Sequence, residues 1–425
     1  MVLMPFHAFI STWGGSTVGP YQVWKVWKEI LLVALVIISI NVAYKDKALF
    51  RKLVGSPWAR VVLLYIVMHL VAIMFSNKDL DALAYGLAIN LRIVGFFFVS
   101  FVLFSSIKLS NKQLLKILFI PCGIVIGFGL LQLFFLPNSF LSHFGYQKNV
   151  TIAPSNTIDD QPDQIRIMST LRGPNPLGAY LVLPGILLVS VVLSYAPVLR
   201  YKWNQANMVK GGVAATGLLI VLYGSQARAA WIGFIISIAM LFMLSLSKKW
   251  RVYVVGAGVF LSISLGLIGY QARQTSFVQN SILHNNPATG GEVTSNDAHI
   301  AAAKEGFGDV VSRPLVGCGP GCAGPASFYN KNGPRLAENY YIQIAQEVGL
   351  IGLGLFLAFI ALIGLELFKL RDNYIALGLL ASLIGLSFAN LLLHVWADDS
   401  LAYVWWGLAG AVIAMGAVSP KSLSE

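Results

Sequence analysis

The sequence predicts an all-α polytopic membrane protein. Of its 425 residues, 57% are hydrophobic and 11% are charged, whereas about a quarter of the residues in a soluble domain carry a charge. Mean hydropathy is +0.72. Apolar runs of about 16–25 residues recur along the chain, and runs of that length cross a bilayer as helices. We therefore expect one transmembrane domain covering residues 1–425, with eleven or twelve spanning helices.

The expected spans follow one another with mostly short connections. They lie at roughly 29–44, 58–75, 82–104, 113–136, 176–195, 209–224, 228–246, 250–270, 339–365, 374–393 and 400–418. Gly and Pro within several of them are typical of membrane helices. Residues 2–10 are apolar but too short to span, and they lack the pattern of a signal peptide. They are either the end of a twelfth helix or an interfacial segment, and both interpretations stay open.

The distribution of basic residues predicts the orientation. Sixteen Lys and Arg occupy the connections 45–60, 105–116, 196–210, 247–251 and 366–373. Only two occupy the short connections of the other side, at 76–81, 224–228 and 394–399. Since basic loops stay cytoplasmic, the net charge of +12 reports topology. Nucleic-acid binding is a poor explanation, because these charges are scattered over thin loops and do not gather on one face.

Two longer segments, about 137–175 and 271–338, are expected on the external side. The second contains a capping-box pattern at Thr294 and Asp297. Apolar residues then recur at helical spacing: Ile300, Ala303, Phe307, Val310 and Val311. We expect an amphipathic helix across the outer mouth of the bundle, ended by Pro314 and a glycine-rich turn. The alternative is an interfacial helix whose only role is packing.

The three cysteines give no disulfide scaffold. Cys122 falls within an expected helix. Cys318 and Cys322 lie in an external Gly/Pro-rich turn and could form a local disulfide in an oxidising compartment. Two thiols alone make a poor zinc site, and no sequence signature of metal or nucleotide chemistry occurs. We therefore expect no metal and no cofactor.

Two arginines at external helix starts are candidates for binding phosphate. Arg172 precedes a Pro-Asn-Pro helix start, and its guanidinium can hold phosphate oxygens in a fork geometry. Arg228 sits in a short hairpin at the first turn of a helix, where a cation beside a helix N-terminus favours a diphosphate. The alternative for both is an interfacial arginine that reaches toward lipid headgroups.

A third arginine is expected deep in the membrane. Arg92 lies about ten residues into its span, where a charge is costly and is usually paired or functional. Glu347 lies at similar depth in a later span and is its expected partner. A structural ion pair is the favoured interpretation, and a substrate-binding role is the alternative.

Four further residues are candidates near the outer surface. Glu338 and Asn339 open the span at 339–365. A carboxylate there is either a helix cap or a general base that takes a proton from an attacking hydroxyl. His394, at the end of a span, and His299, on the loop helix, are possible substitutes as base or acceptor-site residues. Each could equally be a structural histidine.

The chain resembles the O-antigen ligase and Wzy polymerase superfamily of bacterial membrane glycosyltransferases. Three pieces carry the resemblance: Arg172 before Pro-Asn-Pro, Arg228 in a Gly-Ser-x-x-Arg hairpin, and the family pattern His-(Asn/Ser/Gln), nine residues, Gly, two residues, Gly. Here the last piece reads Glu338-Asn339, then Gly349 and Gly352, preceded by a Pro-Leu-x-Gly-x-Gly-x-Gly turn at 314–321. Glutamate thus stands where the family has histidine.

The resemblance implies a GT-C-like fold and a specific chemistry. The family uses a polyprenyl-diphosphate-linked glycan as donor and transfers it, outside the cytoplasmic membrane, to a hydroxyl of a glycan, lipid or protein. Its arginines hold the diphosphate and its histidine activates the acceptor, without metal. For this chain, we expect Arg172, Arg228 and Glu338 to act in catalysis, with inversion at the anomeric carbon. Asn339, Arg92, His394 and His299 are expected to bind substrate. The alternatives are a lipid-linked oligosaccharide flippase or transporter, and a scaffold protein of the same pathway.

Overall fold

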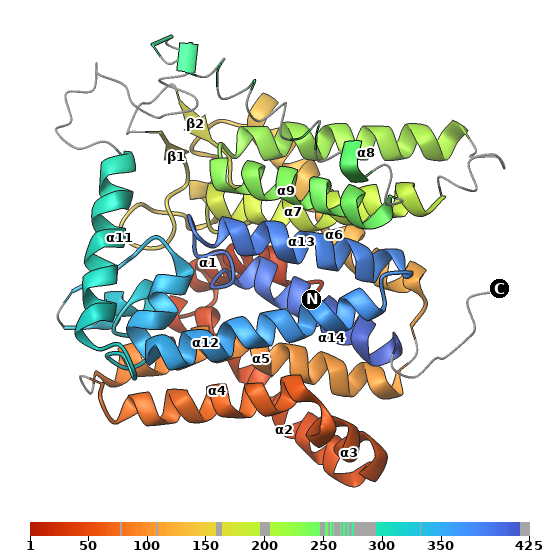
Figure 1. Cartoon of the computed structure of the whole chain (residues 1–425). Helices are drawn as coiled ribbons and strands as arrows, with labels where there is room; N and C mark the ends of the chain where they lie inside the picture. Colours follow the sequence, from red (N-terminus) through yellow and green to blue (C-terminus); the bar gives the residue numbers. More distant parts are fainter. Residues whose placement is uncertain are drawn as a thin grey trace.

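The computed structural model is a bundle in which most helix axes are roughly parallel to one another (Figure 1). It describes residues 1–76, 79–107, 109–158, 164–195, 205–246, scattered positions between 251 and 275, and 295–416 except 332. The only sheet in these residues is a two-stranded antiparallel one, β1 (Asn156–Thr157) with β2 (Ile165–Arg166). The prediction of an all-α polytopic membrane protein is confirmed.

The described helices follow the apolar runs of the sequence. They are α1 (His7–Thr17), α2 (Tyr21–Lys45), α3 (Lys47–Gly55), α4 (Pro57–Ile73), α5 (Leu80–Ser106), α6 (Asn111–Phe134), α7 (Pro174–Tyr195), α8 (Gln205–Gly224), α9 (Arg228–Ser245), α11 (Ser295–Ser312), α12 (Tyr340–Lys369), α13 (Tyr374–Ala389) and α14 (Asp399–Gly416). Short 3-10 turns occur at Met4–Phe6, Phe140–Phe144 and Gly324–Tyr329.

Ten of the eleven expected spans are helical, and the run at 250–270 lies largely outside the described residues. Within the described residues, six helices (α2, α5, α6, α7, α9 and α12) are long and apolar enough to cross a membrane. A seventh span arises if α3 and α4, bent by 74°, count together. The apolar parts of α8 and α13 are shorter. The helix α8 nevertheless covers its whole expected span at 209–224, whereas α13 ends at Ala389, before the expected residue 393.

The core of the bundle forms around α14. This helix is buried along nearly its whole length, and Trp396, Trp405 and Trp406 are fully buried in contact with one another. Glycine lets α14 approach α5 closely, because a Cβ at Gly410 would meet the carbonyl oxygen of Phe97 at 2.6 Å. Small residues at helix contacts are the usual means of packing in membranes, where burial alone does not drive association.

A break in α12 explains the glycines of the family pattern. Gly349 has a left-handed φ of 69°, and a Cβ there would lie against the Leu315 carbonyl. The turn at 314–321 fits into this break: the Leu350 amide donates to Pro314 O at 2.7 Å, and the Cys318 amide to Gln346 O at 2.8 Å. The turn thereby satisfies backbone groups that the broken helix would leave unpaired.

The predicted partner of Arg92 is wrong. Arg92 forms its ion pair with Asp399, the first residue of α14. Glu347 instead accepts hydrogen bonds from the Asn90 side chain at 2.5 Å and from the Gly321 amide at 2.7 Å, and it fixes the docked turn to α5. The segment between α13 and α14 carries Asp399 to the depth of Arg92, and the linear sequence does not show this depth.

The predicted loop helix is α11, which lies across one end of the bundle (Figure 1). The α2–α3–α4 turn and the α12–α13 connection, both rich in Lys and Arg, lie at the other end (Figure 1). The proposed cap at Thr294 lies outside the described residues. Of the expected apolar face, Val310 is buried while Ile300, Phe307 and Val311 are exposed. The helix packs through Gly306, whose missing side chain lets α11 approach Ala337 and α12.

The turn at 314–321 contributes one further local feature. Cys318 and Cys322 are joined by a disulfide whose Cα atoms are 6.0 Å apart. This resolves the alternative that the sequence left open. Cys122 is a free, buried thiol in α6.

Candidate functional site

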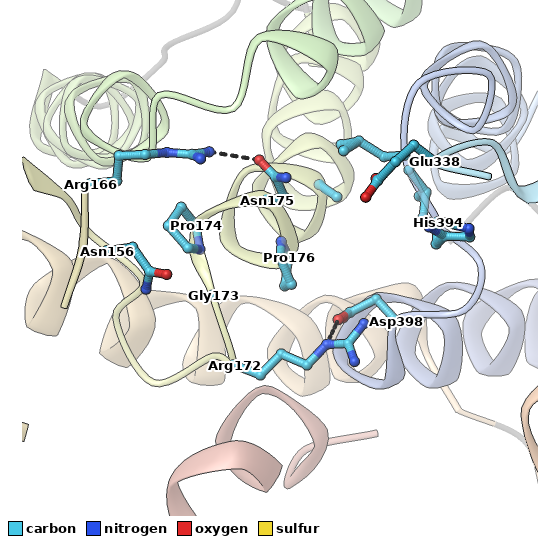
Figure 2. A pocket seen from close by; sticks show the side chains of 13 residues that line it. Asn156, Arg166, Arg172, Gly173, Pro174, Asn175, Pro176, Glu338, His394 and Asp398 are labelled. Atoms are coloured by element: carbon cyan, nitrogen blue, oxygen red, sulfur yellow. Dashed lines mark hydrogen bonds and ion pairs between the residues drawn. The ribbon is translucent and has the colours of Figure 1, made fainter. Parts of the chain in front are cut away.

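A cavity of about 410 Å³ opens where three segments meet at the α11 end of the bundle (Figure 2). The start of α7, Glu338 just before the Asn339 cap of α12, and the segment before α14 line most of it. The lining residues are Asn156, Arg166, Arg172, Gly173, Pro174, Asn175, Pro176, Ala179, Glu338, Leu393, His394, Val395 and Asp398. Three of the seven candidates, Arg172, Glu338 and His394, are thus brought together from positions up to 222 residues apart in sequence.

Arg172 is held in place by a buried carboxylate. Its Nε donates to Asp398 Oδ2 at 3.0 Å. The side chain of Asp398 is only 4% exposed, whereas that of Arg172 is 44% exposed. Asp398 Oδ1 also accepts from the Ser400 amide at 3.0 Å and caps α14. Asp398 contacts the guanidinium through Nε, and Arg172 lines the cavity, so its Nη groups can meet an anion there.

Arg166 is a second guanidinium in the cavity, which the sequence analysis did not identify. Its Nη2 donates to Asn175 Oδ1 at 2.6 Å, and its Nε donates to Ser225 O at 3.1 Å. It therefore ties β2 to the start of α7 and to the α8–α9 hairpin. Burial, together with the nearby positive charge of Arg228, lowers the pKa of Arg166 to about 10. It stays protonated at neutral pH, and an anion in the cavity would relieve the repulsion between the two cations.

Arg228 does not line the cavity, but its charge acts on Arg166. It is the first residue of α9, and Gln226, two residues earlier in the hairpin, has a left-handed φ of 50°. Arg166 Nη2 also donates to the carbonyl of Gln226 at 3.3 Å. The effect of Arg228 on Arg166 places the two arginines in one positively charged region. The structure therefore brings Arg228 near the site through Arg166.

Glu338 lies on the opposite side of the cavity from Arg166 (Figure 2). Its backbone has a left-handed φ of 52°, which is uncommon for a residue with a side chain. Its Oε2 lies 3.9 Å from Nδ1 of His299 on α11. Asn339 caps α12, since its side chain accepts from the Tyr341 amide at 2.9 Å. The cap thus belongs to Asn339 and leaves the Glu338 carboxylate available for other chemistry.

His394 lies beside Glu338 on the same side of the cavity (Figure 2). The residue is half-buried, but its Nε2 is out of contact with solvent and has no hydrogen-bond partner among the described residues. Burial, and after it the positive charge of Arg172, lowers the pKa of His394 to about 4. The ring is therefore neutral at physiological pH. A neutral imidazole with an unpaired nitrogen can exchange a hydrogen bond with a substrate hydroxyl.

The start of α7 adds a further attraction for anions. Gly173 to Pro176 line the cavity, and the positive end of the helix macrodipole lies there. Together with Arg166 and Arg172, it makes one side of the cavity electropositive. The other side presents a carboxylate and a neutral imidazole. This combination can hold an anionic leaving group next to a group that accepts a proton.

Two predicted residues lie away from this arrangement. Arg92 is buried in α5 with Asp399 and does not line the cavity. His299 reaches it only through Glu338. In the described part of the chain, no three His, Cys, Asp or Glu side chains gather closely enough to hold a metal ion. The expectation of chemistry without a metal stays a prediction.

Comparison with known families gives a match, which covers part of the site. The O-antigen ligase family model matches residues 212–357. This match, over 146 of the 425 residues, supports membership of the O-antigen ligase superfamily. No curated protein matches it. The matched segment runs from α8 into α12, and it contains Arg228, Glu338 and Asn339 as well as the docked turn. Membership places the chain among the ligase- and polymerase-like proteins of surface-glycan biosynthesis.

Little in the sequence identifies the cavity residues that the sequence analysis missed. Arg166 precedes Arg172 by six residues, but it follows a polar loop in which a lone arginine is unremarkable. Asn175 was quoted only as part of the Pro-Asn-Pro start. Asp398 follows His394 within a short connection, and its proximity to Arg172 depends on how α7 and α14 pack.

Proposed function

We propose that this protein transfers a glycan from a polyprenyl diphosphate, of the undecaprenyl type, to an acceptor hydroxyl of a glycan or lipid. The observation that carries the proposal is the polarity of the cavity. Arg166, Arg172 and the start of α7 line one part, while Glu338 and His394 lie across from Arg166. A diphosphate leaving group fits the first part and a hydroxyl nucleophile fits the second.

The proposed site of reaction is the external face of the cytoplasmic membrane. The helix α11 lies at one end of the bundle and the Lys/Arg-rich α2–α3–α4 turn at the other (Figure 1). His299 of α11 contacts the cavity residue Glu338, which associates the cavity with the α11 end. Basic connections remain on the cytoplasmic side. A nucleotide-free external space favours a lipid-linked diphosphate as the donor. The charge that develops on its oxygens needs fixed cations, which the arginines supply.

The proposed mechanism is a single displacement. The Nη groups of Arg172 and the cavity side of Arg166 hold the diphosphate, and Arg228 adds positive potential near Arg166. Glu338 takes the proton from the acceptor hydroxyl as its oxygen attacks the anomeric carbon. The bond from that carbon to the diphosphate oxygen breaks, and the pair of electrons leaves with the diphosphate. Attack from the face opposite the leaving group inverts the anomeric centre.

Two roles in this mechanism go to positioning residues. Asp398 fixes Arg172, and Asn175 fixes Arg166, each through one hydrogen bond. Holding the reactants in one geometry removes much of the entropic part of the barrier. The helix α11 covers the Glu338 side of the cavity through His299, and this cover limits access of water, which would otherwise compete with the acceptor.

The test is glycan transfer in proteoliposomes with a polyprenyl-diphosphate-linked oligosaccharide as donor. We compare wild type with Arg172→Ala, Arg228→Ala and Glu338→Gln, and use Arg371→Ala, at the opposite end of the bundle, as the matched control. Transfer by wild type and by the control, with loss in the other three variants while they remain folded and inserted, supports the proposal. No transfer by wild type with any such donor contradicts it.

The same assay separates the two candidate bases. If Glu338→Gln keeps full activity and His394→Gln loses it, the proton goes to the histidine. Loss in Glu338→Gln with activity kept in His394→Gln assigns it to the glutamate.

A further inference from the structure

A second polar cavity, of about 370 Å³, lies at the C-terminal end of α11. It is separate from the cavity described above and shares no lining residue with it. Three segments form its wall: the last turns of α11, the disulfide-bonded turn, and the strand-like segment before α12. The lining residues are Asp309, Ser312, Arg313, Cys318, Cys322, Asn330, Gly333 and Arg335.

The walls of this second cavity are fixed by hydrogen bonds. The Gly324 amide donates to Arg335 O at 2.8 Å, and the Arg335 amide donates to Ser327 Oγ at 2.8 Å. Asp309 accepts from Gln346 Nε2 at 2.8 Å, which ties α11 to α12. The disulfide closes the remaining side. A cavity held in this way exists before any ligand arrives, so binding needs little reorganisation.

The two arginines of this second cavity differ in their partners. Arg335 forms ion pairs with Asp309 and, at 3.4 Å, with Glu305. Arg313 is exposed and forms no ion pair with any residue that the structure describes. Its guanidinium is therefore a cation available to a ligand, and its fork of donors matches a carboxylate. The Ser312 hydroxyl beside it suits a sugar hydroxyl.

The second cavity lies along α11 from the proposed reaction site. His299, which contacts Glu338, and Asp309, which lines the second cavity, are ten residues apart on this helix. At a rise of 1.5 Å per residue this separation is about 15 Å, and it is about 21 Å to Arg313, which follows the last residue of α11. A glycan whose terminal hydroxyl reaches Glu338 can follow α11 and place a later sugar at Arg313.

We propose that the second cavity binds an anionic sugar residue of the glycan acceptor, with Arg313 holding its carboxylate. This inference rests on the proposed function, because that function supplies the glycan. It adds a subsite that contacts the substrate away from the reacting bond, and it assigns to the acceptor a negatively charged sugar.

The test measures binding directly and does not depend on transfer. Full-length protein in nanodiscs is titrated with a hexamer of hexuronic acid and, for comparison, with the neutral maltohexaose. The variants are Arg313→Ala and Lys304→Ala, the latter removing an exposed cation from the same helix outside the cavity. We expect Arg313→Ala to weaken hexuronate binding by about tenfold, the loss of a charge-assisted hydrogen bond at an exposed site, and Lys304→Ala to leave it nearly unchanged.

Other results overturn the inference. Equal weakening in both variants would show a general attraction to positive charge. Equal affinity for the neutral hexamer would contradict the preference for an anionic sugar. Absence of hexuronate binding to wild type would contradict the existence of the subsite. The failure of the proposed function is a different result, because it shows as absent transfer in proteoliposomes whether or not hexuronate binds.

Discussion

Replacement of Glu338 by glycine separates the fold from the chemistry at this residue. Its φ of 52° places the backbone in the left-handed region, which costs a residue with a side chain about 1–2 kcal/mol and costs glycine almost nothing. The contact between Glu338 and His299 spans 3.9 Å between partly exposed side chains, so it contributes about 0–1 kcal/mol. We expect Glu338→Gly to leave the stability unchanged or to raise it by about 1 kcal/mol.

The same substitution in a helix gives a matched control. Glu305 lies within α11 and its carboxylate pairs with Arg335 at 3.4 Å. Glycine in a helix interior costs about 1 kcal/mol. Glu305→Gly should therefore lower the stability, while Glu338→Gly should not. For activity, the expected order of the two variants is reversed, because Glu338 is the proposed base. Glu338→Gly should lose about 10²–10⁴-fold in transfer rate, while Glu305→Gly should keep most of the wild-type rate.

Both quantities are measurable on the same preparations. Thermal unfolding in detergent, followed by tryptophan fluorescence, reports stability, and transfer in proteoliposomes reports activity. Glu338→Gly melting below wild type by as much as Glu305→Gly would refute the assignment of backbone strain. Glu338→Gly retaining wild-type transfer would refute the assignment of the base, and the strain argument would stand independently.

Three further predictions use other parts of the structure. Asp398→Asn should preserve the α14 cap, since Asn caps helices as well as Asp. It should still lower the transfer rate about tenfold, because the ion pair that holds Arg172 is lost. An unchanged rate with the same donor would contradict the positioning role of Asp398. The pKa of His394, about 4 in the folded state and 6.5 ordinarily, means that the unfolded chain binds more protons between these values. Wild-type melting temperature should therefore fall as pH drops from 6.5 to 4, and His394→Gln should show a shallower fall; equal slopes would contradict the burial of the ring. Gly349→Ala should destabilise the protein by at least 2 kcal/mol, because it combines a left-handed φ with a clash against the docked turn. Gly354→Ala, which meets open space on the same helix, should leave the melting temperature near that of wild type.

The sequence predicted most of the architecture because apolar length and charge placement are local properties. Ten of the expected spans are helices, and the loop helix formed close to its expected bounds at Ser295–Ser312. Its packing face was predicted only in part: Val310 is buried as expected, but Ile300 and Phe307 are exposed, and α11 contacts α12 through the small Gly306. Close approach of two backbones, and not apolar area, decided which side of the helix is buried.

The functional site, like the fold, was predicted only in part from the sequence. Arg172, Glu338 and His394 were identified from their positions at helix ends, and the structure brings them to one cavity. Arg166 was missed because a single arginine in a polar loop has no periodic or motif signal. The Arg92 pairing was wrong because depth along a helix does not fix which neighbour lies opposite.

By itself, the sequence determined that this chain is a multi-pass membrane protein, with its basic connections on one side. Hydrophobic length and charge asymmetry are enough for these properties, since the bilayer acts on each segment separately. Only the tertiary structure decided which polar groups meet. The turn at 314–321 packs into the break at Gly349. The connection between α13 and α14 brings Asp398 to Arg172 and Asp399 to Arg92. Buried charges must find partners in an apolar surrounding, and those partners come from helices whose contacts depend on packing.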